Sequence, residues 1–157
     1  MRIVGIDPGY ATTGYAILNI KSSKNYELID CGVVKTKAET YFPERLEQIY
    51  KEILNIFSKY KPNIVSIESL YFQNNQKTAI AVAQARGVII LAAQISKVSI
   101  VEYTPLQVKF AVTGCGKSKK MEIMKCTRTI LKLDFLPKPD DAADAIAIAI
   151  CHADRKM

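Results

Sequence analysis

The chain is poor in the residues that build disulfide frameworks and zinc sites. Its 157 residues include no tryptophan, one histidine and four cysteines, and the cysteines form no CxxC pair. A secreted disulfide scaffold is therefore excluded. With 49% hydrophobic and 24% charged residues, the composition also excludes collagen, a coiled coil and a disordered tail. The length predicts one domain, residues 1–157, with enough chain to bury a sizeable core.

Long apolar runs are also scarce. The most apolar run, residues 88–93, lies between Arg86 and Gln94, so we expect no membrane span and no membrane partner. The chain begins directly with a strand-like segment at 2–7, so we expect no signal peptide. These absences predict a cytoplasmic protein with reduced thiols.

Positive charge, in contrast, is abundant and unevenly placed. The formal net charge is +7, and the segment 105–138 holds eight basic and two acidic residues, so the remaining chain is nearly neutral. A concentration of this kind indicates a surface for a polyanion. The alternative is an ordinary solvated surface rich in lysine. The basic residues are Lys109, Lys117, Lys119, Lys120, Lys125, Arg128, Lys132 and Lys138.

Hydrophobic periodicity predicts an α/β domain. Three strands joined by short turns form an antiparallel meander, and two further strands each follow a helical crossover. We therefore expect a mixed five-stranded sheet flanked by helices on both faces. The predicted strands are 2–7, 13–20, 26–36, 64–68 and 99–103. The predicted helices are 43–60, 77–96, 105–113, 118–133 with Ser118 as its cap, and 140–152.

Carboxylates lie at the ends of predicted strands and at the start of the last predicted helix, where an α/β fold usually has its functional groups. Asp7 and Glu68 each end a strand that is otherwise apolar, and a buried carboxylate is costly unless it is paired or binds a metal. Asp141 and Asp144 lie three residues apart at the start of the last helix and so share a face. Taken singly, the aspartates could be a turn residue, a helix cap and a solvated helix residue. Glutamate is depleted in strands, so Glu68 is harder to explain in such terms.

Together the four carboxylates indicate a cation site. Clustered carboxylates repel one another, and divalent cations remove that repulsion. Oxygen ligands without a Cys/His cluster favour Mg²⁺ or Mn²⁺ over zinc. Two such ions roughly 4 Å apart catalyse phosphoryl transfer, and the basic segment suits the backbone of a nucleic acid.

Several short motifs follow one another along the chain. They are Gly5-Ile-Asp-Pro-Gly9, Thr13-Gly-Tyr-Ala16, Ile67-Glu68, Gln84-Ala-Arg-Gly87, Glu102-Tyr103, Gln107-Val-Lys109, Gly114-x-Gly116 and Asp141-Ala-Ala-Asp-Ala-Ile-Ala147. In this order and spacing they closely resemble the RuvC family of Holliday-junction resolvases (crossover junction endodeoxyribonucleases), and the resemblance covers essentially the whole chain. It implies a ribonuclease H-like fold, a symmetric homodimer and Mg²⁺-dependent paired nicks at a four-way DNA junction in recombination and repair. It also raises RuvA and RuvB, the branch-migration proteins, as partners.

The resemblance also assigns roles to residues. It implies two Mg²⁺ ions per active site, with Mn²⁺ able to substitute, on the metal ligands Asp7, Glu68, Asp141 and Asp144. Asp140 is an acid that the family motif does not require, and it is either a helix cap or a substitute ligand.

Lysines and aromatic residues complete the site that the resemblance implies. Lys109 and Lys120 match lysines that support cleavage at the scissile phosphate; the alternative is contact with the DNA backbone alone. Tyr71, with Phe72 beside it, matches an aromatic residue that acts near the junction centre. It either stacks on an unpaired base or is a partly buried loop residue. Further predicted DNA contacts are Lys117, Lys119 and Arg86.

Two other residue features have competing interpretations. The 77–96 helix is apolar on more than one side, so it is covered by a dimer partner or by the sheet alone. His152 is interpreted as a terminal helix residue and not as a metal ligand, because it lies about three turns from Asp141.

Three other functions compete with the junction resolvase. A branched-DNA nuclease with relaxed structure selectivity would use the same site. The spacing Asp7-x-Gly9-x₄-Gly14 is also similar to the phosphate-binding turn of actin-like ATPases, although those proteins pair two such domains. A non-catalytic junction-binding protein would be expected to have lost carboxylates, and all four are present.

Overall fold

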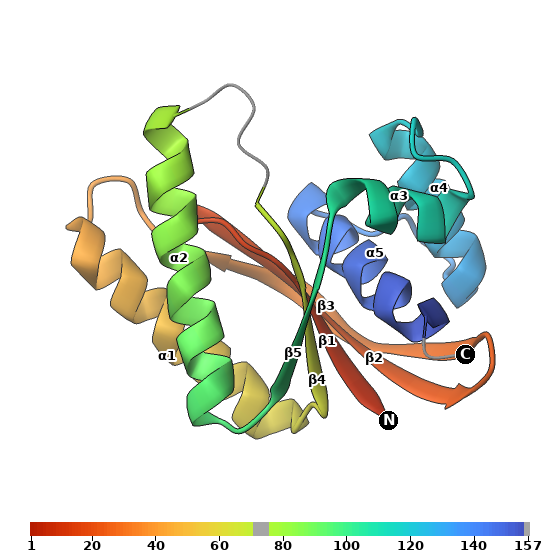
Figure 1. Ribbon diagram of the computed structural model, residues 1–157, viewed down its shortest axis with the longest axis horizontal. Helices are drawn as coiled ribbons and strands as arrows, with labels where there is room; N and C mark the ends of the chain where they lie inside the picture. The colour runs from red at the N-terminus through yellow and green to blue at the C-terminus, as the bar shows by residue number, and fades with distance from the viewer. Residues whose placement is uncertain (71–75, 156–157) are drawn as a thin grey trace.

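The computed structural model describes residues 1–70 and 76–155. Five strands form one sheet in the order β3-β2-β1-β4-β5. The first three strands pair antiparallel, and β1, β4 and β5 run parallel, so the predicted mixed sheet is confirmed (Figure 1). The strands are β1 (Arg2–Asp7), β2 (Thr12–Ser22), β3 (Asn25–Lys35), β4 (Ile64–Glu68) and β5 (Ser99–Tyr103).

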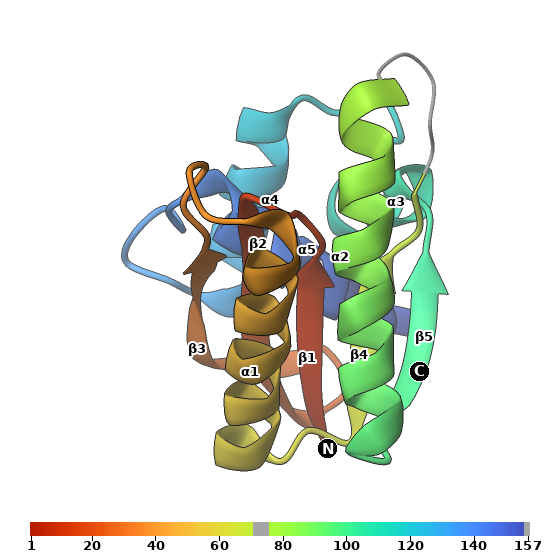
Figure 2. The same ribbon diagram turned by 90° about the vertical axis from the view of Figure 1, so that its left-hand side faces the viewer.

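Helices cover both faces of the sheet, as predicted. The first two helices pack side by side on one face, and the other three lie on the opposite face, where α5 crosses β1 and β2 (Figures 1 and 2). Each face has its own hydrophobic core. The helices are α1 (Phe42–Tyr60), α2 (Gln76–Ile95), α3 (Pro105–Thr113), α4 (Lys120–Leu131) and α5 (Asp140–Arg155).

Two glycines let α5 approach the sheet closely. A Cβ atom added at Gly5 would lie 2.1 Å from the carbonyl oxygen of Ala145, and one added at Gly14 would lie 2.0 Å from that of Asp141. Both distances are far below van der Waals contact, so only glycine allows this spacing. The buried Ser66 hydroxyl of β4 donates a hydrogen bond of 2.8 Å to the carbonyl oxygen of Ile148, which fixes α5 along the sheet. The start of α5 is therefore held against the central strands.

The sequence correctly predicted the N-terminal cap of α3 but not that of α4. Thr104 forms the expected cap of α3: its Oγ1 accepts from the Gln107 N–H at 3.2 Å, and Gln107 Oε1 accepts from the Thr104 N–H at 2.9 Å. The prediction that Ser118 caps α4 is wrong, because Lys119 is the cap residue. The Ser118 hydroxyl instead donates to Thr113 Oγ1 at 2.8 Å. This bond ties the loop before α4 to the end of α3.

Helix α2 is apolar along much of its length, and much of it is exposed. The segment Thr78–Ile95 is long and apolar enough to cross a membrane by length and composition, and only 22% of it is buried. The prediction from the sequence missed this likeness because it considered only the uninterrupted run after Arg86. The likeness rests on length and composition alone, and the absence of a membrane span stays a prediction. Ile80, Leu91 and Ile95 are each more than half exposed. The helix nevertheless packs against α1. Exposed apolar surface of this kind is typical of interaction sites.

Candidate active site

Asp7 and Glu68 lie at the same edge of the sheet because their strands are neighbours. In the parallel pairing of β1 with β4, Ile6 is opposite Ile67. The next residue of each strand is the carboxylate, so both side chains lie at the carboxyl ends of adjacent strands. This is the edge at which α/β sheets place their functional groups.

The start of α5 brings two more carboxylates to this edge. Asp7 is opposite Gly14 in the pairing of β1 with β2, and Gly14 lies against the backbone of Asp141. Asp144 follows one turn later on the same face of α5. The structure thus brings together the four predicted carboxylates from two strands and one helix.

The pKa values of Asp7 and Glu68 reflect their burial and the charges of the neighbouring carboxylates. Burial, followed by the charges of Glu68, Asp144 and Asp141, raises the pKa of Asp7 from 3.8 to about 8. Burial and then the Asp144 charge raise the pKa of Glu68 from 4.5 to about 7. At neutral pH, without a cation, Asp7 therefore retains its proton for much of the time. A divalent cation would relieve both the burial cost and the repulsion.

This electrostatic strain predicts a pH-dependent stability of the metal-free protein. A carboxyl group whose pKa is higher in the folded state than in the unfolded state stabilises the fold at low pH. That contribution is lost as the pH rises from the unfolded value of 3.8 towards the folded value of about 8. Without metal, Asp7→Asn should therefore be more stable than the wild type at pH 8, by roughly 5 kcal/mol, and nearly equal to it at pH 4. Denaturant unfolding in EDTA at both pH values measures this difference, and an equal stability at pH 8 would contradict it.

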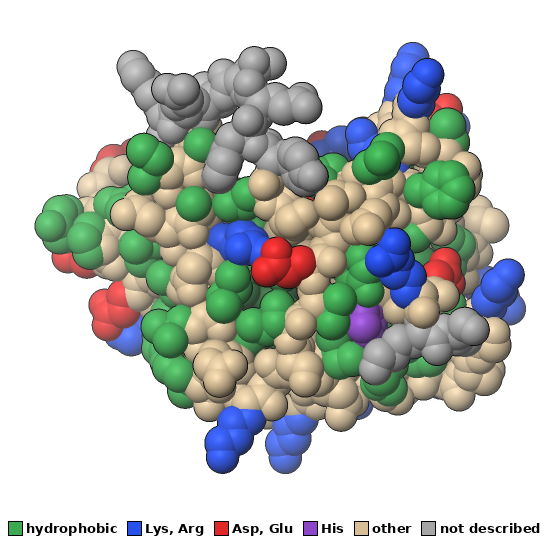
Figure 3. Space-filling model, viewed as in Figure 1, with side chains coloured by type: hydrophobic (Ala, Val, Ile, Leu, Met, Phe, Trp, Pro, Cys, Tyr) green, Lys and Arg blue, Asp and Glu red, His purple; other side chains and the backbone are tan. Residues whose placement is uncertain are grey.

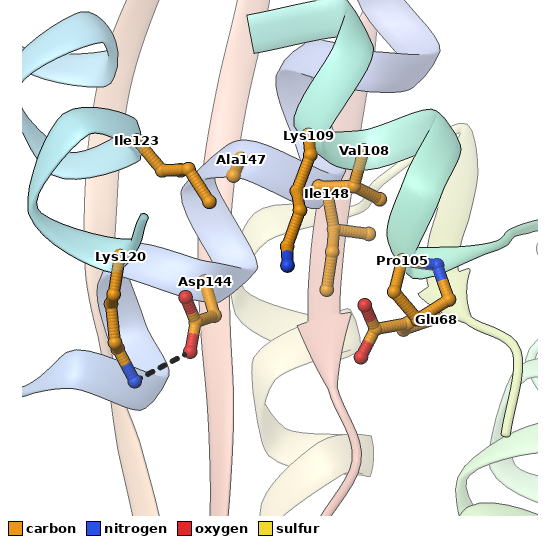
Figure 4. Close-up of a pocket in the computed structure, with 9 residues that line it drawn as sticks. All are labelled: Glu68, Pro105, Val108, Lys109, Lys120, Ile123, Asp144, Ala147 and Ile148. Carbon is orange, nitrogen blue, oxygen red and sulfur yellow. Dashed lines mark ion pairs between the residues drawn. The ribbon is translucent and has the colours of Figure 1, made fainter. Parts of the chain in front are cut away.

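Lys120 is the nearest cation to the carboxylates of α5. Its Nζ lies 3.0 Å from Asp144 Oδ2 and 3.4 Å from Asp140 Oδ2, and Figure 4 shows the pair with Asp144. Burial raises the pKa of Asp144, while the Lys120 ammonium lowers it. Asp140 is exposed, and besides its contact with Lys120 its charge contributes to raising the pKa of Asp144.

Lys109 reaches into a cavity between Glu68 and Asp144 (Figure 4). The cavity measures about 240 Å³, and α3, α4 and α5 provide most of its wall. The Lys109 charge lowers the pKa of Glu68 against the larger effect of burial. The two lysines predicted to act at cleavage thus face the carboxylates from opposite sides of one cavity. Its lining is Glu68, Pro105, Val108, Lys109, Lys120, Ile123, Asp144, Ala147 and Ile148.

The donor set fits a hard divalent cation in its chemistry. The predicted donors are carboxylate oxygens, the kind that Mg²⁺ and Mn²⁺ prefer, and burial and the neighbouring carboxylates raise the pKa values of Asp7 and Glu68, a cost that a cation would relieve. Within residues 1–70 and 76–155, no three His, Cys, Asp or Glu side chains converge closely enough to ligate one ion. Asp7, Glu68, Asp141 and Asp144 therefore stay predicted metal ligands.

The other predicted DNA contacts are placed differently. Lys117 and Lys119 are exposed in the loop before α4, and Figure 3 shows basic side chains projecting from the end of the molecule that α3 and α4 form. Arg86 is mostly buried: it donates to the backbone carbonyl of Glu68 and pairs with Glu102. Tyr71 and Phe72 lie outside the described residues.

His152 is far from this site. It is buried in α5, and its Nδ1 lies 2.8 Å from the Tyr103 hydroxyl. Sequence reasoning placed it correctly on the last helix but did not foresee its burial. It also missed the contacts that Arg86 and Lys120 make within the chain, because ion pairs between distant segments leave no periodic signal.

Carboxylates gathered at the end of the central strands of a mixed five-stranded sheet define a nuclease of the ribonuclease H-like class. The model of the family "Crossover junction endodeoxyribonuclease RuvC" matches residues 3–152. The chain belongs to the RuvC family of crossover junction endodeoxyribonucleases.

Individual relatives span nearly the whole chain. The Crossover junction endodeoxyribonuclease RuvC of Caldicellulosiruptor saccharolyticus is 47% identical over 152 residues, which cover 97% of this chain and 92% of the relative. The structure of Thermus thermophilus RuvC superposes with a TM-score of 0.92 at 32% identity, covering 99% of this chain and 95% of the other. T. thermophilus RuvC in complex with a Holliday junction substrate gives a TM-score of 0.94 at 33% identity, covering 99% and 94%.

Family membership decides between the classes that the sequence left open. The chain is a metal-dependent endonuclease that hydrolyses DNA phosphodiester bonds, and the predicted ribonuclease H-like fold is confirmed. The alternatives of an ATPase-like domain and of a non-catalytic binding protein are therefore set aside.

Proposed function

We propose that this protein resolves four-way DNA junctions by paired, symmetric nicks, using two Mg²⁺ ions in each active site. The observation that carries the proposal is the gathering of four carboxylates and two lysines at one sheet edge, beside the basic segment 105–138. The carboxylates suit metal ions, and the basic segment suits a DNA backbone. The proposal agrees with the junction bound by the T. thermophilus relative.

The chain's own residues divide the work as follows. Asp7, Glu68, Asp141 and Asp144 hold the metal, and Mn²⁺ has the coordination chemistry to replace Mg²⁺ there. When bound, such ions activate water and stabilise the leaving oxygen of a phosphodiester. Lys109 and Lys120 orient the scissile phosphate and offset the negative charge that develops on it. Lys117 and Lys119 hold the adjoining backbone.

This division predicts distinct effects of the two lysines on cleavage and binding. Lys109→Ala and Lys120→Ala should each slow cleavage roughly a hundredfold, while junction affinity at low salt falls only a fewfold, because other basic residues keep contact with the backbone. Single-turnover cleavage rates and mobility-shift titrations measure the two effects, and Lys138→Ala is a matched control in the same basic segment. Equal losses in rate and affinity would indicate backbone contacts alone.

The exposed face of α2 supports the proposal of a homodimer. Ile80 and Leu91 are 67% and 52% exposed. Gly87 between them has no atom within 4 Å of an added Cβ. Spacings of seven and four residues place these positions on one face of the helix, with room at Gly87 for a close helix crossing. A second copy of this chain bound there would place two active sites about a two-fold axis, which matches a two-fold substrate.

The dimer is tested with Leu91→Glu. A buried charge at this position should convert the dimer into a monomer at micromolar concentration, and the monomer should nick one strand without the paired second nick. Light scattering and mapping of the nicks on both strands measure the two outcomes. Lys97→Glu, at an exposed position just beyond α2, is the control. A wild-type protein that is monomeric at micromolar concentration would contradict the paired-nick mechanism.

The proposed activity itself is tested by substrate choice. The protein with Mg²⁺ is incubated with a mobile four-way junction, a three-way fork and a linear duplex, and the nicks are mapped to nucleotide resolution. We expect symmetric nicks on the junction and little cutting of the duplex. Equal cutting of the fork would instead favour the branched-DNA nuclease with relaxed selectivity. Association with RuvA and RuvB, a cytoplasmic location and a single domain over residues 1–157 stay predictions.

A further inference from the structure

Arg86 of α2 makes contacts that a surface DNA-binding residue would not make. Its side chain is only 16% exposed, and its guanidinium pairs with Glu102 of β5 at 2.6 Å. Its Nε also donates a hydrogen bond of 3.2 Å to the backbone carbonyl of Glu68. One rigid side chain therefore connects α2 with the ends of two neighbouring strands.

The carbonyl that accepts the hydrogen bond from Arg86 belongs to Glu68, the last residue of β4. The pairing of β1 with β4 stops at Ile67, so the Glu68 carbonyl lies where the sheet ladder towards β1 has ended. On the other side, the strand is held by the Ser69 N–H, which donates to the Tyr103 carbonyl at 2.8 Å. Arg86 thus restrains the peptide that follows Glu68, in addition to its pairing with β5 and beyond the point where pairing with β1 ends.

We propose that Arg86 is a positioning residue that holds Glu68 in place for metal binding. The proposal rests on the proposed function in one respect, the role of Glu68 as a metal ligand. A planar guanidinium suits the task because its Nε donates to the Glu68 carbonyl while its Nη2 forms an ion pair with the Glu102 carboxylate. Glu102 is 51% exposed, so it orients Arg86 from outside the site.

The same contacts argue against a DNA contact by Arg86. To reach a phosphate, its guanidinium would have to leave both the Glu68 carbonyl and the Glu102 carboxylate. Lys117 and Lys119 are exposed and need no such rearrangement. Arg86 also adjoins Gly87 on the exposed face of α2. Its hydrogen bond to the Glu68 carbonyl therefore connects the proposed dimer helix with the proposed metal site.

Metal binding without DNA gives the first test. Mn²⁺ binding to the wild type, Arg86→Gln and Arg86→Lys is measured by calorimetry. Groups that orient a metal ligand typically change metal affinity 10–100-fold, so we expect Arg86→Gln to bind Mn²⁺ at least about tenfold more weakly. Arg86→Lys should not restore the affinity, because a single ammonium does not reproduce the fork. Wild-type Mn²⁺ affinity in Arg86→Gln would overturn the proposal.

Junction binding gives the second test and separates the two roles of Arg86. Affinity is measured in EDTA over a range of salt concentrations. A positioning residue leaves the salt dependence unchanged, whereas loss of a phosphate contact lowers the slope of log K against log[salt] by about 1. A lowered slope with unchanged Mn²⁺ affinity would make Arg86 a DNA contact and overturn the proposal.

Glu102→Gln tests the same contact in case the Arg86 variants misfold. It removes the orienting carboxylate at a half-exposed position and should weaken Mn²⁺ binding in the same direction, but less. In the double variant Arg86→Gln/Glu102→Gln the two losses should not add, because both act through one contact. Additive losses would overturn the chain of contacts proposed here. Junction cleavage by the wild type is measured separately, so a failure of the proposed function would be recognised as such.

Discussion

Asp7→Asn should reduce junction cleavage by roughly a thousandfold or more while leaving junction binding intact or tighter. Asp7 lies among three other carboxylates, whose charges together with burial raise its pKa to about 8. The amide removes a metal ligand, and loss of metal assistance of several kcal/mol corresponds to about three orders of magnitude in rate. It also removes a negative charge near the DNA backbone, which favours binding.

The experiment compares single-turnover cleavage in Mg²⁺ with mobility-shift affinity in EDTA. Asp134→Asn is the matched control, because Asp134 is an exposed aspartate within the basic segment and its substitution changes the net charge equally. We expect the control to cut at the wild-type rate. Cleavage by Asp7→Asn at a rate close to that of the wild type would contradict the assignment of Asp7 to the metal site.

Gly14→Ala should damage the site without touching any carboxylate. Its Cβ would lie 2.0 Å from the Asp141 carbonyl oxygen, so the start of α5 must move away from β2. Overpacking against backbone costs about 1–3 kcal/mol or more, and the melting temperature should fall by roughly 5–10 °C. A displacement of Asp141 and Asp144 by about 1 Å should slow cleavage about a hundredfold.

Thermal unfolding and single-turnover cleavage at 20 °C, well below the melting transition, separate the two effects. Ser22→Ala is the control, because Ser22 is an exposed residue of the same strand and the substitution adds no bulk. It should leave both the melting temperature and the cleavage rate close to those of the wild type. Wild-type cleavage by folded Gly14→Ala would show that the position of α5 does not set the spacing of the carboxylates.

The sheet and the carboxylates were largely predictable because their signals are local. The apolar run ending at Asp7, the short strand ending at Glu68 and the Thr104 cap of α3 are each legible within a few residues, and the structure has all three. The resemblance supplied what periodicity could not, namely that these strand ends meet the start of the last helix. The roles of the site residues themselves stay predictions.

Contacts between distant segments were not predictable. Nothing near Arg86 in the sequence indicates that it grips the Glu68 carbonyl, and nothing near Lys120 indicates its pairs with Asp140 and Asp144. The start of α4 was misplaced for a related reason: Ser118 is a good cap by type, but its hydroxyl finds Thr113 on the preceding helix. Tertiary hydrogen bonds here override the local preference.

The two ion pairs of Lys120 have a consequence for how ligands of the site influence one another. Its ammonium faces the carboxylates of Asp144 and Asp140. If Asp144 binds a cation as proposed, its attraction for Lys120 weakens and the ammonium becomes available to a phosphate. A phosphate that attracts Lys120 would likewise leave Asp144 available to a cation. Under the proposed roles we expect metal and DNA binding to be positively cooperative, and by thermodynamic reciprocity each must strengthen the other by the same factor.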